Sequence, residues 1–323
     1  MRILFFLIFF FTNIFLCSSQ TVDDVYGDSK WYIQLKGGYG ISFPNSPLDS
    51  PLNEIKPAFI SVGEDSIIRQ TSSYGTMGPG LKVEIQIGRV LSNNLAVEIG
   101  TRYNKANEVN LATVRTPTFS AIHDVQTTWF DVMPGFVVST GFNKKFSMYS
   151  RISLSLPVAG NTKSLVSIDD REGRLATYYL NVYRLLLPTL NENLTSLVST
   201  KIEVDADTEG AFSVGFSGAL GAKMQISDKL SLIAEISLQS LHIKAKESIY
   251  NSFTQSSELN GFPIVIDSSQ EYFNHTIYLD EITSESNFHL YNEQVDVDAP
   301  KEEIAFKQNH SNASLLVGLS FSF

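Results

Sequence analysis

Apolar and polar side chains alternate with a period of two in several separate stretches after residue 30. In 31–43, WYIQLKGGYGISF, apolar side chains occupy the odd-numbered positions apart from Gly37, while polar residues or glycine occupy most even-numbered ones. Successive side chains of a β-strand point to opposite faces of its sheet. The pattern therefore predicts a strand with one apolar face and one polar face.

The same alternation returns in three pairs of stretches, and a few polar residues join the members of each pair. The pairs are 81–88 with 95–103, 130–140 with 146–156, and 212–224 with 230–238. Short polar connections between alternating stretches predict β-hairpins. A first strand at 31–43 and a last strand at 313–323 bring the predicted number of strands to eight.

The connections between these strands alternate between short and long. Three are a few residues long, and the other four span 44–78, 104–124, 158–209 and 248–310. Bacterial transmembrane barrels have short periplasmic turns and long extracellular loops, whereas a soluble sandwich has no reason to place every long loop at one end. We therefore predict an all-β fold, a single transmembrane antiparallel up-and-down β-barrel of eight strands with long extracellular loops.

The sequence allows more than one structure for each of two segments. The segment Leu175–Pro188 can form an amphipathic helix over the barrel mouth or extend a hairpin above the membrane. The segment Phe262–Leu279 can supply an extra hairpin, which would raise the number of strands to ten.

The first residues have the pattern of a secretory signal peptide. A basic Arg2 precedes an apolar run at 3–16 and small residues at 17–19, and the run is shorter than the roughly 17–25 residues that a spanning helix needs. We expect cleavage after Ser19, which divides the chain into a signal peptide, 1–19, and one outer-membrane β-barrel domain, 20–323. An uncleaved anchor and a lipid attached to Cys17 are the alternatives.

Composition and charge narrow the possible functions. The only cysteine is Cys17, so a chain cut after Ser19 has no thiol for a disulfide, a metal site or a nucleophile. The formal charge is −10, and loss of Arg2 makes it −11, which disfavours nucleic acid as a partner. Much of this acid lies in the segment 248–310, which has eleven acidic residues and two lysines.

The polar faces of the predicted strands carry charges that would point into the barrel. They are Lys36, Lys82, Glu84, Glu98, Arg102, Arg151, Lys223 and Glu235. An eight-stranded barrel is just wide enough for side chains to fill it. We therefore expect these five basic and three acidic side chains to pair and plug the lumen. The alternative is a narrow ion path whose selectivity the same residues set.

The last strand resembles the assembly signal of outer-membrane barrels. In ASLLVGLSFSF the chain ends on Phe323, and apolar residues occupy alternate positions before it: Leu315, Val317, Leu319 and Phe321. The stretches WYIQLKGGYG and GPGLKVEIQIGRVLSNNLAVEIGTRY are similar to the first hairpins of small bacterial outer-membrane barrels such as OmpA, OmpX and OmpW. This resemblance implies a location in the bacterial cell outer membrane, with outer-membrane lipid and the barrel assembly machinery as partners. It covers the strands and leaves the loops unmatched.

No recognised catalytic or metal motif appears in the chain. The five histidines are His123, His242, His275, His289 and His310. None fits the His-x-Ser pattern of barrel deacylases or the Asp-x-His pattern of omptin-like proteases, and no pair has metal-ligand spacing. We expect surface or interface positions for them, no enzymatic activity, no cofactor and no bound metal.

Two functional hypotheses follow from the sequence. In the first, an integral barrel with a plugged lumen uses large acidic loops to contact an unidentified extracellular partner, because loops of this length are usually functional or disordered. In the second, the barrel is a narrow pore or a carrier for small or hydrophobic solutes across the outer membrane.

Overall fold

The structure is a computed structural model. It describes residues 31–44, 46–48, 69–72, 74–142, 144–178, 194–264, 271–288, 292 and 294–323. The predicted signal peptide with Cys17, and also His289, lie outside the described residues. Within the described ranges, no helix is both long enough and apolar enough to cross a membrane.

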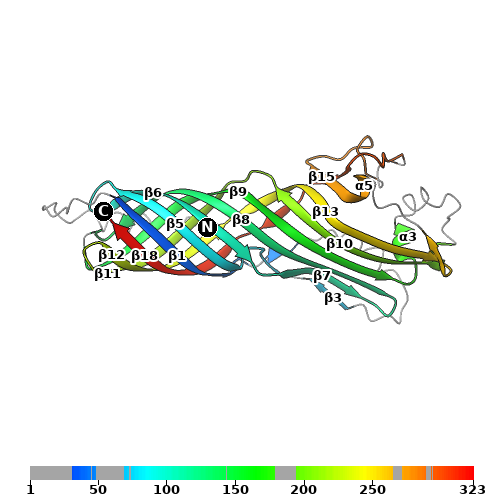
Figure 1. Ribbon diagram of the computed structural model, residues 1–323, viewed down its shortest axis with the longest axis horizontal. Helices are drawn as coiled ribbons and strands as arrows, with labels where there is room; N and C mark the ends of the chain where they lie inside the picture. Colours follow the sequence, from blue (N-terminus) through cyan, green and yellow to red (C-terminus); the bar gives the residue numbers. More distant parts are fainter. Residues whose placement is uncertain are drawn as a thin grey trace.

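Eight antiparallel strands pair in a closed ring (Figure 1). In ring order they are β1 (Trp31–Ser42), β5 (Gly80–Val90), β6 (Leu95–Ala106), β8 (Phe119–Ser139), β9 (Phe146–Asp170), β11 (Gly215–Gln225), β12 (Leu230–Ser240) and β18 (Asn312–Ser322). The last strand closes the ring by pairing with the first, from Tyr32 opposite Ser322 to Ser42 opposite Asn312. The prediction of an eight-stranded up-and-down barrel is confirmed.

Further strands and short helices lie outside this ring. The strands are β2 (Ser46–Pro47), β3 (Arg69–Ser72), β4 (Tyr74–Gly75), β7 (Val109–Arg115), β10 (Val198–Gly210), β13 (His242–Leu259), β14 (Phe262–Ile264), β15 (His275–Leu279), β16 (Lys301–Ile304) and β17 (Lys307–Asn309). The helices are α3 (Arg174–Tyr178), α5 (Glu271–Asn274) and the 3-10 turn η1 (Thr195–Leu197). In Figure 1 β7, β10 and β13 reach far beyond the ring, at the end opposite the short turns.

Much of what the sequence indicated as long loops consists of further β-strands that continue the barrel wall beyond the ring. We call this part, formed by β7, β10, β13 and the far ends of β8 and β9, the extension. Strand β6 is followed by β7, and the chain returns as β8 after residues 116–118, so the expected loop at 104–124 is a hairpin. Strand β9 runs on to Asp170 and pairs there with both β8 and β10. Strand β13 pairs with β10 along the length of both. The prediction of loops at these places is therefore wrong in part. The extended strands are polar on their outer face, and in β10 the apolar Ile202 and Val204 lie on the inward face instead.

The segment 262–279 does not enter the ring. Strands β14 and β15 both pair with β13, outside the barrel, so the number of ring strands stays at eight. In the other open segment, Leu175–Pro188, the structure forms the short helix α3 at its start. Residues 179–193 lie outside the described part of the chain.

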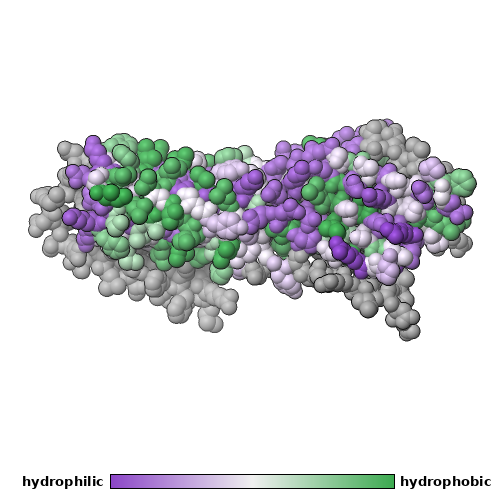
Figure 2. All heavy atoms as spheres, turned by 60° about the horizontal axis from the view of Figure 1, so that its bottom comes forward, coloured by the Kyte–Doolittle hydropathy of each residue, from purple (hydrophilic) through white to green (hydrophobic). Residues whose placement is uncertain are grey.

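Apolar side chains face outward from the ring and polar side chains face inward. Leu35, Ile85 and Leu315 are about half exposed, whereas Glu84 and Arg102 are fully buried. In Figure 2 apolar side chains gather over the half of the molecule that holds the ring, and hydrophilic ones cover much of the adjoining wall. This distribution is the reverse of a water-soluble protein and is that of a transmembrane barrel.

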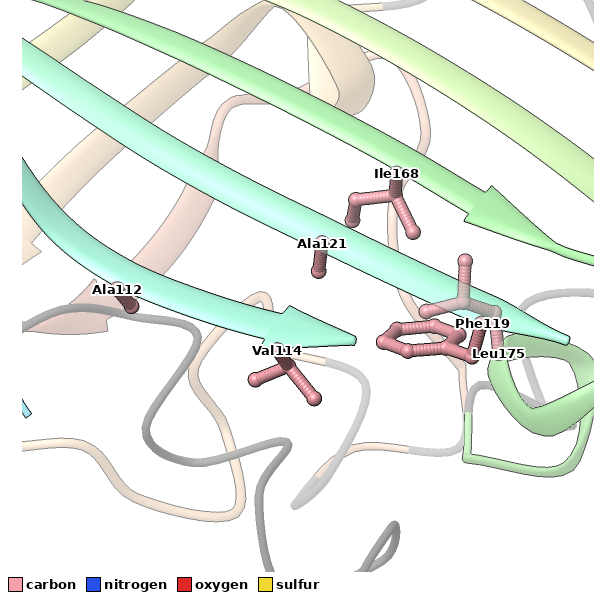
Figure 3. Close-up of a cluster of buried hydrophobic side chains, with 6 residues drawn as sticks. All are labelled: Ala112, Val114, Phe119, Ala121, Ile168 and Leu175. Carbon is pink, nitrogen blue, oxygen red and sulfur yellow. The ribbon is translucent and has the colours of Figure 1, made fainter. Parts of the chain in front are cut away.

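A separate apolar cluster holds the far end of the wall together. Side chains from β7, β8, β9 and α3 form it: Ala112, Val114, Phe119, Ala121, Ile168 and Leu175 (Figure 3). The amide of Leu175 donates a hydrogen bond to Asp170 Oδ2 at 2.7 Å, which fixes α3 to the end of β9. The extension therefore has a small core of its own, distinct from the barrel interior.

Candidate functional site

The strand register brings the predicted interior charges together. Lys36 on β1 lies directly opposite Glu84 on β5, and Glu84 lies opposite Arg102 on β6. Directly opposed side chains on one face of an antiparallel pair have Cβ atoms about 4.5–5.5 Å apart. Three strands thus place a lysine, a glutamate and an arginine side by side inside the barrel.

Glu84 is surrounded by cations. Its carboxylate lies 3.0 Å from Lys36 Nζ and accepts a hydrogen bond from Arg102 Nε at 2.6 Å. Arg151 Nη2, from β9 across the lumen, lies 3.4 Å away. Three cations around one fully buried carboxylate offset much of the free-energy cost of removing it from water.

Glu235 on β12 contacts the same cations from another side of the ring. Its carboxylate lies 2.9 Å from Lys36 Nζ and 2.5 Å from Arg151 Nη2. Tyr149 donates its hydroxyl to Glu235 Oε2 at 2.8 Å. Because the contacts of Glu235 come from β1 and β9, this cluster joins walls that are not adjacent in the ring.

Glu98 is the third acidic member and lies closer to the short turns. It accepts a hydrogen bond from the Tyr32 hydroxyl at 2.6 Å, and Arg151 Nη1 lies 3.9 Å from its other oxygen. Lys36, Arg102 and Arg151 therefore face three carboxylates, and the formal charges of this group cancel.

Two glycines make room for the tyrosines that reach these carboxylates. Gly88 lies opposite Tyr32 in the register, and Gly221 lies opposite Tyr149. A Cβ atom added at Gly88 would lie 2.2 Å from the Tyr32 ring, and one at Gly221 would lie 2.3 Å from the Tyr149 ring. Any larger residue would displace the ring and its hydroxyl from the carboxylate.

A second layer lies nearer the extension and centres on Asp131, which the sequence reasoning missed. Asp131 Oδ2 accepts hydrogen bonds from Trp129 Nε1 at 3.1 Å, Asn104 Nδ2 at 3.1 Å and Gln239 Nε2 at 2.9 Å. Lys82 donates to Asn104 Oδ1 at 2.9 Å and lies 5.2 Å from the centre of the Trp129 ring. Alternation alone could have found Asp131, since its neighbours Phe130 and Val132 belong to the apolar face.

Lys223 is placed differently from the other seven predicted charges. It is partly exposed at the mouth near the short turns, while the others are buried in the interior. Adding Asp131 to the acids and leaving out Lys223 changes five basic and three acidic side chains to four of each. Among the described residues, the interior charges are therefore equal in number, because Lys223 lies at the rim and Asp131 adds an acid.

The described histidines are scattered, and two of them are buried. His123 packs inside the extension with Nε2 3.4 Å from Ser164 Oγ, and His310 packs against Trp129 with ring centres 5.1 Å apart. Surface positions are therefore wrong for these two: His123 lies on an inward-facing position of β8, and His310 lies in the short connection between β17 and β18, where it is buried. Across the described ranges, no group of three or more His, Cys, Asp or Glu residues could hold a metal ion.

The residues that resemble an assembly signal lie on the lipid-facing side of β18. Leu315, Val317, Leu319, Phe321 and Phe323 are all 45–60% exposed. Their side chains are thus accessible on the outer surface of the closing strand. Their role in assembly stays a prediction.

No protein-family model and no curated protein sequence matches the chain. Its structure is similar to the outer membrane protein OprG from Pseudomonas aeruginosa, with a TM-score of 0.39 and 10% identity over 93% of this chain and 99% of that one. Neisserial surface protein A matches with a TM-score of 0.33 and 11% identity over 92% of this chain and 100% of that one. A major outer membrane protein from Thermus thermophilus matches with a TM-score of 0.32 and 10% identity over 91% and 99%. Similarity at this level does not identify a family, and the description as a barrel rests on its own strand pairing.

Proposed function

We propose that the protein is an integral outer-membrane barrel with a plugged lumen, and that its long extracellular wall is a platform for contacts outside the cell. The plugged lumen is supported by the charge-balanced network around Glu84. Arg151 on β9 reaches across the lumen and contacts both Glu84 on β5 and Glu235 on β12. A path for ions through the ring would have to break these buried pairs.

The outer face of the extended wall supports the second part of the proposal. Lys163 on β9 lies 2.9 Å from Asp205 on β10, and Asn251 on β13 donates to Asp207 at 2.8 Å. These contacts join three adjacent strands above the apolar band and leave a hydrated polar surface. Because its outer face is polar and it extends beyond the apolar band, the sheet of β9, β10 and β13 is better suited to contact an extracellular partner than lipid.

The plug is tested by conductance of the refolded protein in a planar bilayer. Under the proposal the unaltered protein gives no measurable conductance. The variant Arg151→Ala should conduct ions, because it removes the side chain that links Glu84 and Glu235. Stable conductance steps in the unaltered protein would replace the plugged barrel with the alternative, a narrow pore or solute carrier. A gel-mobility shift on heating verifies that each sample is folded.

The platform is tested by labelling intact cells with a membrane-impermeant maleimide. Ser256→Cys, exposed on β13, should react, whereas the matched variant Lys145→Cys, exposed in a short turn, should react only after the outer membrane is permeabilised. The opposite pattern would reverse the proposed orientation. Equal labelling at both positions without permeabilisation would contradict the membrane location.

A further inference from the structure

Four exposed cations at the end of the barrel with the short turns have no acidic partner among the described residues. They are Arg89 near the end of β5, Lys144 and Lys145 in the turn after β8, and Lys229 in the turn after β11. By contrast, seven cations of the extension and the elements attached to it form ion pairs with acids: Lys163, Arg171, Arg174, Lys201, Lys244, Lys246 and Lys301.

The charge at the turn end is opposite to that of the whole chain. The described residues of the three short turns include one acidic side chain, Asp228, which is exposed. The chain as a whole has a formal charge of −10. A local surplus of cations on an acidic protein suits a partner that is itself anionic.

Arg89 is held on the side of the barrel that faces lipid. It lies outward on β5, directly opposite Trp31 on β1. Its guanidinium lies 5.5 Å from the centre of the Trp31 ring, which is 44% exposed. Tryptophan on the outer face of a barrel marks the level of the lipid headgroups. This stacking therefore places a cation at headgroup level.

The strand pairing places Lys229 on the other side of Trp31. Trp31 and Phe323 exchange backbone hydrogen bonds, and the Ser322 amide donates to the Lys229 carbonyl oxygen at 2.9 Å. Strands β1 and β18 thus separate Lys229, beside β12, from Arg89 on β5. Neighbouring strands lie 4.7–4.9 Å apart, so the two backbones are about 14 Å apart. The two cations flank an exposed aromatic surface instead of lying against each other.

Apolar side chains on the same rim fix this surface at the boundary of the membrane. More than half of each is exposed: Leu91, Phe146, Ile226 and Phe323. We propose that the rim binds the headgroups of anionic phospholipids, with Arg89 and Lys229 contacting their phosphates on either side of Trp31. Under the proposed orientation these lipids belong to the periplasmic leaflet. The proposal does not depend on the plug or on the extracellular platform.

The test measures which lipid lies next to Trp31, using the refolded protein in phosphatidylcholine vesicles. Part of the lipid is replaced by phosphatidylglycerol, or in parallel by phosphatidylcholine, brominated near the headgroup end of the acyl chains, where bromine quenches tryptophan fluorescence. The other tryptophan, Trp129, is 1% exposed, and a Trp31→Phe variant measures its constant contribution. The protein retains residues 20–30, which include three aspartates and one lysine, so that their charges are present.

The unaltered protein should prefer phosphatidylglycerol at least fivefold, because one basic side chain near an anionic surface strengthens binding by about that factor. Arg89→Gln and Lys229→Gln should each lower the preference severalfold, and the double variant should show none. Raising the salt concentration to 1 M should also remove most of it, since the charges are exposed. A gel-mobility shift on heating verifies that each variant is folded.

Lys105→Gln is the matched control. Lys105 is also exposed and has no acidic partner among the described residues, but it lies on β6 near the other end of the ring, opposite Leu81. Its loss should leave the preference within twofold. A preference below twofold in the unaltered protein, one that persists in the double variant, or an equal loss in Lys105→Gln would overturn the proposal. Because both leaflets have the same composition, a wrong orientation of the barrel would not change this result.

Discussion

Removing the charge of Glu84 should destabilise the barrel more than any surface change. Glu84 is fully buried and contacts Lys36, Arg102 and Arg151. The variant Glu84→Gln keeps the shape of the side chain but leaves three cations facing only two carboxylates. Breaking a buried ion pair by removing one partner typically costs about 3–5 kcal/mol, and we expect a loss of about this size in the free energy of unfolding.

The measurement is equilibrium unfolding by urea in lipid vesicles, followed by tryptophan fluorescence, to which Trp129, buried inside the barrel, and the exposed Trp31 contribute. The control is Glu203→Gln, since Glu203 has 58% of its side chain exposed and should change the free energy by less than about 0.5 kcal/mol. The double variant Glu84→Gln with Lys36→Met restores charge balance and should be more stable than Glu84→Gln alone. A loss below about 1 kcal/mol in Glu84→Gln, or no recovery in the double variant, would refute the idea that charge balance holds the plug together.

Three further predictions concern other parts of the molecule. Phe323→Ser should sharply reduce the amount of heat-modifiable protein in the outer membrane while Ser322→Ala does not, and normal assembly of the first variant would remove Phe323 from the assembly signal. Phe119→Ala should destabilise the extension by about 3–5 kcal/mol by opening a cavity in its core, whereas Phe262→Ala, at an exposed position, should have little effect on protease resistance. The hydrogen bond from Lys246 holds the pKa of Glu247 below its usual value, so this carboxylate contributes stability above its unfolded-state pKa and loses it as pH falls through the lower folded-state pKa. Protection of β15 amides, corrected for intrinsic exchange, should therefore fall as the pH is lowered below about 4.3, the ordinary pKa of a glutamate, and a Glu247→Gln variant that shows the same fall would exclude this group as the cause.

Local alternation was enough for the ring but not for the extension. Leu35 and Lys36 differ in polarity, so their positions in β1 predict both the strand and its two faces. In β10, the outward Lys201 and Glu203 alternate with the partly buried Ile202 and Val204, so the apolar side of this strand faces inward. The faces of this strand are thus reversed relative to a lipid-facing strand, and a pattern that expects the apolar side to face lipid does not assign it to the barrel.

The sequence by itself determined which side chains enter the lumen, because a β-strand with one lipid-facing side forces its other side inward. It also determined the end at which the short turns lie, whereas the choice between eight and ten ring strands came from the structure, in which β14 and β15 pair with β13 outside the ring. Only the tertiary structure decided which charges meet, because register and ring closure bring Lys36 to Glu235 and Arg151 to Glu84 across long sequence distances. Likewise, the depth of a residue within the barrel, which separates the rim position of Lys223 from the buried position of Asp131, is a property of the closed ring and not of any single strand.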